Sequence, residues 1–250
     1  MSSVHGTGPR SASRSAGTRV KLLDSFELVC DGTTLRLPMS AQRVVVFVAL
    51  HSRPVQRSYV AGSLWLDSCE ERAQANLRSA LWRIHRCNQR LVEVRGQQLA
   101  LGSDVAVDLR QVQELAQRVL HDCTSHDVDV DASALAGDLL PDWYEDWVMF
   151  ERERFRQLRL AALDVLCERL TRAGRLRDAL DVGLAAVAGE PLRESAHRAV
   201  IRVHLTEGNV AEAIRQHRLC RRLLRERLGI EPSARMRELM RDVDMANTVR

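Results

Sequence analysis

Alternating hydrophobic and polar positions in residues 20–38 predict a small antiparallel sheet. Short apolar runs flank Asp31-Gly32, a dipeptide that is typical of a tight hairpin turn. Residues 34–37 alternate between polar and apolar side chains, as a half-buried strand does. We therefore expect two or three strands in this segment.

Two helices are predicted to follow the sheet. The VVVFVAL run within residues 41–51 is apolar on nearly every side of a helix, so this helix should be buried. Ser40 stands at the position of a helix cap. Pro54 interrupts the pattern, and a shorter second helix is expected over residues 58–66.

The clearest helical pattern lies in residues 70–90, where an apolar face opposes a face rich in arginine. Apolar residues at three- and four-residue steps form one stripe of an amphipathic helix, namely Ala73, Leu77, Ala80, Leu81 and Ile84. The opposite face carries Arg72, Ala75, Ser79, Trp82, Arg83 and Arg86, with Asn76 and Arg78 on its flanks.

The charge of this helix has two interpretations. Between Arg72 and Arg95 the sequence contains six arginines and a single acid, Glu93. Guanidinium groups pair with phosphate or guanine, and small side chains between them allow close approach, so this face suits the major groove of DNA. The alternative is a solvated surface helix, and the neighbouring elements must decide between the two.

The elements that follow favour the DNA interpretation. Residues 91–94 and 98–101 are predicted strands around a tight turn at Arg95-Gly96-Gln97. Sheet, three helices and hairpin is the order of a winged helix, whose third helix enters the major groove and whose hairpin is the wing. The arginine-rich helix is therefore the predicted recognition helix.

The second half of the chain is predicted to be almost wholly helical. A helical stretch begins near Asp108, and the later part of residues 139–174 makes one long helix. The polar segment 121–136 between them contains a DVDVD run that superficially resembles a calcium loop, but Ala132 replaces the required glycine and the closing glutamate is missing. Three possible metal ligands in this segment lack an apparent fourth partner, namely His121, Cys123 and His126. We interpret the segment as a surface loop and expect no metal and no cofactor.

An internal repeat indicates the architecture of these helices. Residues 34 positions apart correspond in kind, as in the pairs Gly174 and Gly208, Ala179 and Ala213, and Leu180 and Ile214. Glycine ends the first helix of each pair and alanine lets the second pack closely, which is the tetratricopeptide pattern. Arg225 stands where the second copy should have proline, so that helix is expected to continue to Leu228.

Composition and charge describe a cytoplasmic globular protein of two domains. The 250 residues are 45% hydrophobic and 28% charged, and no apolar run approaches the length of a membrane span. Residues 1–19 carry three arginines and no acid and predict a disordered tail, and residues 20–108 carry 11 basic and 9 acidic residues. The six cysteines show no ligand-like spacing and should be reduced, mostly buried thiols.

The first half resembles a known family. The segments AGSLWLDS, ERAQANLRSALWRIHR and LVEVRGQQLAL are similar to the OmpR-type DNA-binding domain of the SARP family of antibiotic regulatory proteins. Gln56 departs from that pattern, because family members often have Ser or Thr there to cap the second helix. The matching positions are Arg57, Leu64, Trp65, Ala73, Asn76, Leu77, Leu81, Arg83 and Arg86.

The second half resembles the domain that follows the winged helix in SARP proteins. Its LLP…W opening, between Leu139 and Trp147, and its LGIEPS ending are similar to the bacterial transcriptional activator domain. The predicted fold is therefore mainly α with a small β component, a winged helix-turn-helix followed by an all-α tetratricopeptide-like domain. The expected domains are a tail (residues 1–19), the DNA-binding domain (20–107) and the activator domain (108–250).

The resemblance implies a transcription activator of an antibiotic gene cluster. Such a protein binds direct repeats in double-stranded DNA near promoters, usually as a pair of protomers, and contacts RNA polymerase. The groove-facing candidates are Arg72, Ser79, Arg83 and Arg86, the candidates for phosphate contacts are Asn76 and Arg78, and those for the minor groove are Arg95 and Gln97. The polymerase-contact candidates are Asp67, Glu70 and Glu71.

Other interpretations are weaker. Trp82 either covers a thymine methyl group or packs on the first sheet, and packing is the favoured prediction. The motifs GxxxxGK[ST], HExxH, GxSxG and GxGxxG are absent, so no enzyme is expected. A helical-repeat adaptor, whose winged helix serves a protein partner, is the competing class, and a repressor remains a variant of the first. The helical domain should present a concave surface for contact with a second protomer or with RNA polymerase, and the alternative is that it merely stabilises the first domain.

Overall fold

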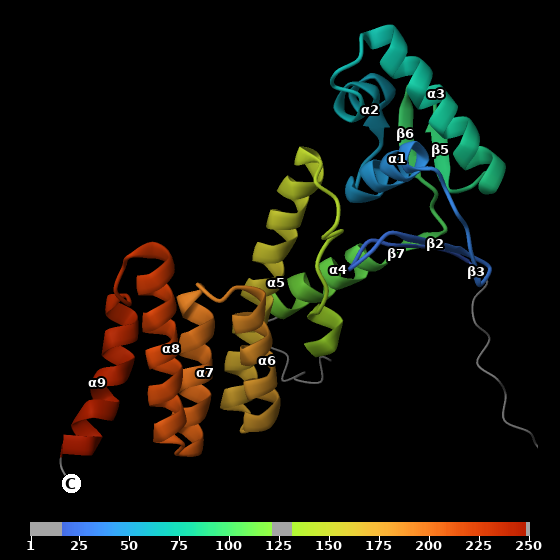
Figure 1. The fold of residues 1–250 in the computed structure, drawn as a ribbon. Coiled ribbons are helices and arrows are strands. Elements are labelled where there is room, and N and C mark those ends of the chain that lie inside the picture. Colours follow the sequence, from blue (N-terminus) through green and yellow to red (C-terminus); the bar gives the residue numbers. More distant parts are fainter. Residues whose placement is uncertain (1–16, 122–131, 249–250) are drawn as a thin grey trace, which may run out of the picture. The chain divides into compact units, whose positions relative to one another are not determined.

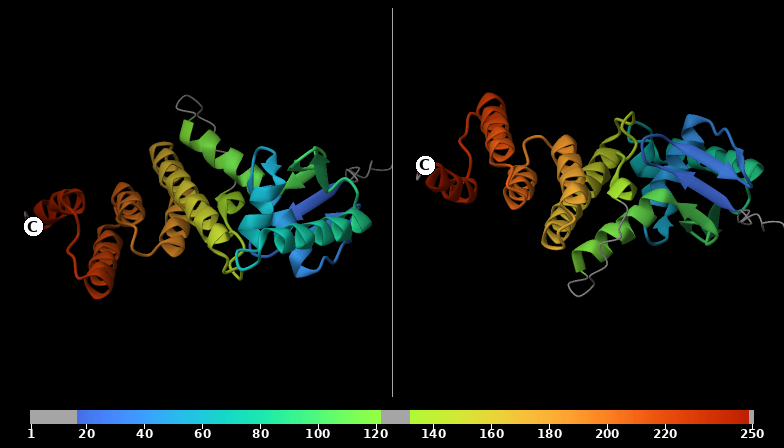
Figure 2. Two further views of the ribbon diagram at one scale, coloured as in Figure 1. Left: turned by 90° about the horizontal axis from the view of Figure 1, so that it is seen from above. Right: turned by 90° about the horizontal axis from the view of Figure 1, so that it is seen from below.

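The computed structural model describes residues 17–121 and 132–248, and the chain divides after Asp108 into two units (Figures 1 and 2). The possible metal ligands Cys123 and His126, the DVDVD run, and most of the predicted tail lie outside the described residues. None of the helices within the described ranges has a stretch that is long and apolar enough to cross a membrane.

A four-stranded sheet opens the first unit, in the order β3-β2-β1-β7. Asp31 and Gly32 both have positive φ, as the predicted two-residue hairpin turn requires. The expected strand over residues 34–37 is wrong beyond Thr34, and the parallel pairing of β7 with β1 was not predicted. The strands are β1 (Thr18–Lys21), β2 (Glu27–Cys30), β3 (Thr33–Thr34) and β7 (Val105–Val107).

Three helices follow, as predicted, namely α1 (Met39–Leu50), α2 (Arg57–Leu64) and α3 (Glu70–Cys87). The prediction that Ser40 caps the first helix is wrong. The helix begins at Met39, and Pro38 is the capping residue, whose carbonyl accepts hydrogen bonds from the backbone of Ala41 and Gln42. Helix α1 is buried along nearly its whole length, as its composition predicts.

A three-stranded sheet in the order β4-β6-β5 forms the wing. The predicted hairpin is present, with positive φ at Gly96 in its turn, while the two-residue strand β4 beside it was not predicted. Gln56 lies at the N-cap of α2 without a side-chain capping bond, in agreement with the departure noted in the sequence. The strands are β4 (Val55–Gln56), β5 (Val92–Arg95) and β6 (Gln98–Leu101).

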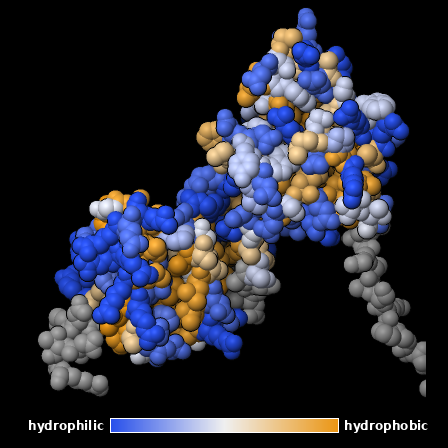
Figure 3. Space-filling model, in the orientation of Figure 1, coloured by the Kyte–Doolittle hydropathy of each residue, from blue (hydrophilic) through white to orange (hydrophobic). Residues whose placement is uncertain are grey.

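The second unit is helical, and α5, α7 and α9 form one layer while α6 and α8 form the other (Figures 1 and 2). Figure 3 shows hydrophilic residues over α8 and α9, where Arg218 and Arg222 are exposed. The helical elements are α4 (Asp108–His121), the short 3-10 helix η1 (Ala132–Leu135), α5 (Asp146–Arg172), α6 (Leu176–Gly189), α7 (Glu194–Glu207), α8 (Val210–Leu228) and α9 (Ala234–Thr248).

The predicted repeat is confirmed in its geometry. Gly174 and Gly208 both have positive φ, and the residue after each donates its backbone N–H to a carbonyl five positions earlier. Ala179 and Ala213 are fully buried, so the second helix of each pair lies close to the first. Helix α8 continues to Leu228, as predicted from the missing proline.

The cysteines only partly follow the prediction of buried thiols. Cys167 and Cys220 are buried, and burial raises the pKa of each thiol to about 11. Cys69 and Cys87 are exposed at the two ends of α3, so the prediction is wrong for them. Both continue the spacing of the apolar stripe, but they lie at the N-cap and at the last residue of the helix, beyond its buried residues.

At Gly183, α6 lies very close to its neighbours α5 and α7. A Cβ atom there would lie 2.8 Å from Val200 Cγ2 and 3.3 Å from Cys167 Sγ. We expect Gly183→Ala to lower the free energy of unfolding by about 1–3 kcal/mol, because the added methyl overpacks a buried site. Thermal unfolding measures this. Gly62→Ala, in a helix with open space around it, is the control, and equal effects of the two substitutions would contradict the packing argument.

His197 is a buried, neutral imidazole. Its Nε2 donates to the Pro191 carbonyl at 2.9 Å, and its Nδ1 accepts from Gln216 Nε2 at 2.9 Å. Burial lowers the pKa of His197, although the Pro191 carbonyl and Glu194 oppose this shift. A proton on Nδ1 would face the Gln216 donor and lose that bond.

We therefore expect the second unit to lose stability as the pH falls below about 6.5, where the unfolded chain takes up this proton and the folded chain resists it. Denaturant unfolding of the wild type and of His197→Gln, compared at neutral pH and near pH 5, measures the contribution. The free energy of unfolding should fall more steeply in the wild type. Parallel pH dependences would show that His197 contributes nothing to it.

Candidate nucleic-acid interface

Helix α3 has a buried face and an exposed face, divided as the sequence predicts. Leu77 is 0% exposed, and Ala73, Ala80 and Ile84 are also buried. The arginine face is open to solvent. Its exposed members are Arg72, Arg78, Ser79, Arg83 and Arg86, whereas Asn76 is half-buried. The structure therefore brings the six candidate residues of the predicted recognition helix onto the solvent side of one element.

The arginines of α3 have no acidic partners among the described residues. In the part of the chain that the structure describes, none of Arg72, Arg78, Arg83 and Arg86 forms an ion pair. An exposed guanidinium group without an acidic partner is available to pair with phosphate or a base edge without first breaking an ion pair. The exposed face of α3 is therefore a positively charged surface.

The wing differs from α3 in this respect. Arg95 donates to Glu93 from Nε at 3.0 Å and from Nη2 at 2.6 Å. Its guanidinium group lowers the pKa of Glu93, assisted by the backbone N–H of Ser103. Gln97 is exposed at the turn. Both predicted wing residues lie at the hairpin tip, but Arg95 is already paired with a carboxylate.

Trp82 contradicts its favoured prediction. It does not pack on the first sheet, because its side chain is 59% exposed. Its contact in α3 is with Arg86, whose guanidinium carbon lies 4.9 Å from the ring centroid. A large exposed aromatic ring beside an arginine adds stacking and apolar contact to the same surface.

Two polar side chains that the sequence analysis missed hold α3 in place. Arg43 of α1 donates to the Leu64 carbonyl at 2.7 Å and so fixes the end of α2, just before the turn into α3. At the other end, Asn88 donates to Thr18 Oγ1 at 2.8 Å and accepts from the Arg90 backbone at 2.9 Å. An arginine within one helix and an asparagine at the end of another carry no signal in the sequence that would distinguish this role.

The acidic residues before and at the start of α3 are all exposed, namely Asp67, Glu70 and Glu71. Glu70 and Glu71 lie in the first helical turn, where carboxylates are stabilised by the helix dipole. Within residues 17–121 and 132–248, no cluster of side chains has the composition of a metal site. These acidic side chains are therefore available to a partner as negative charges and hydrogen-bond acceptors.

The fold and this surface define a class, a winged-helix protein with an appended helical-repeat domain. The model of the bacterial transcriptional activator domain matches residues 104–243. The match covers more than half of the chain, which therefore belongs to the family of proteins with this domain, as the resemblance in the sequence implied.

A solved structure shares this fold. It is EmbR of Mycobacterium tuberculosis, solved in complex with a low-affinity phosphopeptide, which is 16% identical with a TM-score of 0.76. The alignment covers 92% of this chain, which spans 65% of that chain. The likeness shows that the winged helix and the helical domain occur together in the predicted order. No curated protein matches the sequence significantly.

Substitutions on the two faces of α3 should differ in their effect on the free energy of unfolding. We expect Leu77→Ala to lower the free energy of unfolding by about 2–5 kcal/mol, because it leaves a cavity in the core. Trp82→Ala, on the exposed face of the same helix, should change it by less than about 0.5 kcal/mol. Denaturant unfolding of both variants tests the assignment, and a large loss in Trp82→Ala would refute it.

Proposed function

We propose that this regulator binds specific double-stranded DNA through α3 and activates transcription. The observation that supports the proposal is the exposed face of α3, whose arginines have no ion pairs in the described residues. A helix whose apolar face is buried in the domain and whose exposed face is rich in arginine fits the major groove of DNA. Phosphate contacts would position the helix, and contacts with base edges would provide the specificity.

The residues of the surface then take different roles. Arg72, Ser79, Arg83 and Arg86 are the candidates for the groove, and Asn76 and Arg78 are those for phosphates. The exposed Trp82 joins them as a candidate for contact with a thymine methyl group, because it does not belong to the core. Arg95 and Gln97 at the wing tip are the minor-groove candidates, and Arg95 would have to exchange Glu93 for phosphate.

The remaining parts of the proposal concern partners. In it, residues 20–107 bind DNA and residues 108–250 form the activator domain. The protein acts in the cytoplasm, binds direct repeats near promoters as a homodimer, and regulates an antibiotic gene cluster. RNA polymerase would contact the exposed acidic residues Asp67, Glu70 and Glu71.

The experiment that tests this function is the selection of bound fragments from the source genome. We expect the wild type to enrich spaced direct repeats, and Arg83→Ala/Arg86→Ala to lose them. Arg218→Ala/Arg222→Ala is the matched control, because it removes the same charge from exposed arginines on α8. If the wild type enriches no site above background, or if both double variants fail alike, the proposed use of α3 is wrong.

Salt dependence provides a quantitative companion to the selection. If six arginines each neutralise one phosphate, the log–log slope of affinity against salt concentration should be about −5. Arg83→Ala/Arg86→Ala should make the slope shallower by about 2, while the α8 control keeps it. Fluorescence anisotropy at several salt concentrations gives these slopes. A salt-insensitive association would instead support the adaptor class.

A further inference from the structure

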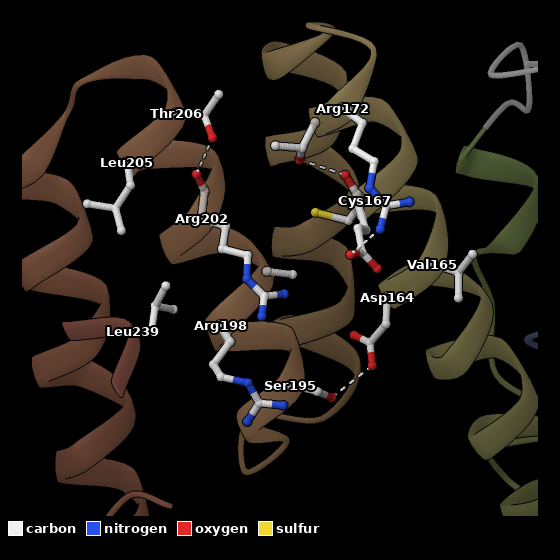
Figure 4. A pocket seen from close by; sticks show the side chains of 13 residues that line it. Asp164, Val165, Cys167, Arg172, Ser195, Arg198, Arg202, Leu205, Thr206 and Leu239 are labelled. Carbon is white, nitrogen blue, oxygen red and sulfur yellow. Dashed lines mark hydrogen bonds and ion pairs between the residues drawn. The ribbon is translucent and has the colours of Figure 1, made fainter. Parts of the chain in front are cut away.

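The second unit contains a groove of about 520 Å³ on the side of α5, α7 and α9 (Figure 4). We call it the inner groove. It is lined by residues of α5 from Asp164 to Arg172, residues of α7 from Ser195 to Thr206, and Leu239 of α9. Packed helices are about 8–10 Å apart, so a groove that crosses three of them is long enough for a peptide segment.

One side of the inner groove carries apolar side chains (Figure 4). Leu205 and Leu239 contribute half-buried side chains, and Ala199 contributes a small buried one that keeps the groove open between its walls. An apolar lining with a few polar groups is typical of a binding site, because burial of apolar groups there gives affinity while the polar groups select the partner.

The charges around this lining are unequal. Three guanidinium groups and two carboxylates line the groove. Both carboxylates are already matched, because Arg193 lies 3.0 Å from Asp164 and Arg172 lies 2.6 Å from Glu168. Neither carboxylate is therefore left to attract a cationic partner.

Arg202 is the lining cation without an acid. Arg198 pairs with Glu194 at 2.9 Å, whereas Arg202 forms no ion pair with any described residue. Its backbone carbonyl accepts from Thr206, but its guanidinium group is exposed and points into the groove in Figure 4. A positive charge beside an apolar lining is complementary to a ligand that carries an anionic group next to apolar groups.

We propose that the inner groove binds a short segment of a partner protein in which an acidic side chain stands beside apolar ones. The carboxylate would pair with Arg202, and the apolar side chains would cover Leu205 and Leu239. DNA is disfavoured, because a phosphate backbone offers no apolar groups to this lining. The proposal goes beyond DNA recognition by α3 and does not depend on it.

A displayed library of random short peptides, selected against the full-length chain, tests the proposal. We expect enriched sequences to combine Asp or Glu with neighbouring apolar residues. For the best peptide, Arg202→Glu should weaken binding by about 10- to 100-fold, as expected for a lost charge-assisted contact, and Arg202→Lys should restore part of it. The control Arg218→Glu places the same charge change on α8, outside the groove, and should bind like the wild type.

A matched change in the peptide makes the test independent of folding. Replacing its acidic residue by the corresponding amide should weaken binding to the wild type but cause little further loss with Arg202→Glu. The proposal is overturned if no peptide is enriched, if the enriched peptides lack acids, or if Arg202→Glu binds them unchanged. It is also overturned if sedimentation shows self-association that Arg202→Glu abolishes, because the groove would then hold a second copy. Binding of genomic fragments, measured in parallel, should be unaffected by these variants, so failure of the DNA proposal would be seen separately.

Discussion

Burial of one face of α3 is the constraint on which the first unit depends. Leu77 and Ile84 insert into the core beside α1 and α2, and this fixes the rotation of the helix about its axis. The core covers only one face of α3. Because the arginines lie on the opposite face, they point toward solvent. Arg43 then holds the end of the preceding helix α2, and Asn88 holds the C-terminal end of α3 against β1.

The second unit relies on small residues in the same way. Gly183 and Ala179 let α6 lie against its neighbours, and the positive-φ glycines Gly174 and Gly208 end α5 and α7 at corresponding positions of the repeat. Stacking of similar helix pairs buries a continuous core, to which Met236 and Met240 of α9 also belong. The alternation of the two layers leaves the inner groove along one of them, so a binding surface follows from the packing of the repeat.

Long periodic segments could be predicted from the sequence, and short pairings could not. The stripe of α3 spans several turns, so its register and its buried face are defined by many residues. Strand β4 has two residues and β7 has three, and each forms because distant backbone lies beside it. Trp82 was misjudged for a related reason. Its size favours burial, but its position on the helix, opposite Leu77, decides its exposure.

The pairing of Arg95 with Glu93 was accessible to sequence reasoning and shows how the charge of the site should be read. Residues two apart in a strand lie on the same face, so these two side chains were placed to meet. On α3 no acid stands three or four positions from Arg83 or Arg86 on the exposed face, and neither arginine forms an ion pair with a described residue. An arginine of the wing therefore contributes less to the attraction for an anionic partner than an arginine of α3, because its charge is already neutralised by a carboxylate. The attraction for an anionic partner is concentrated on α3, and the wing adds to it only where a phosphate can replace Glu93.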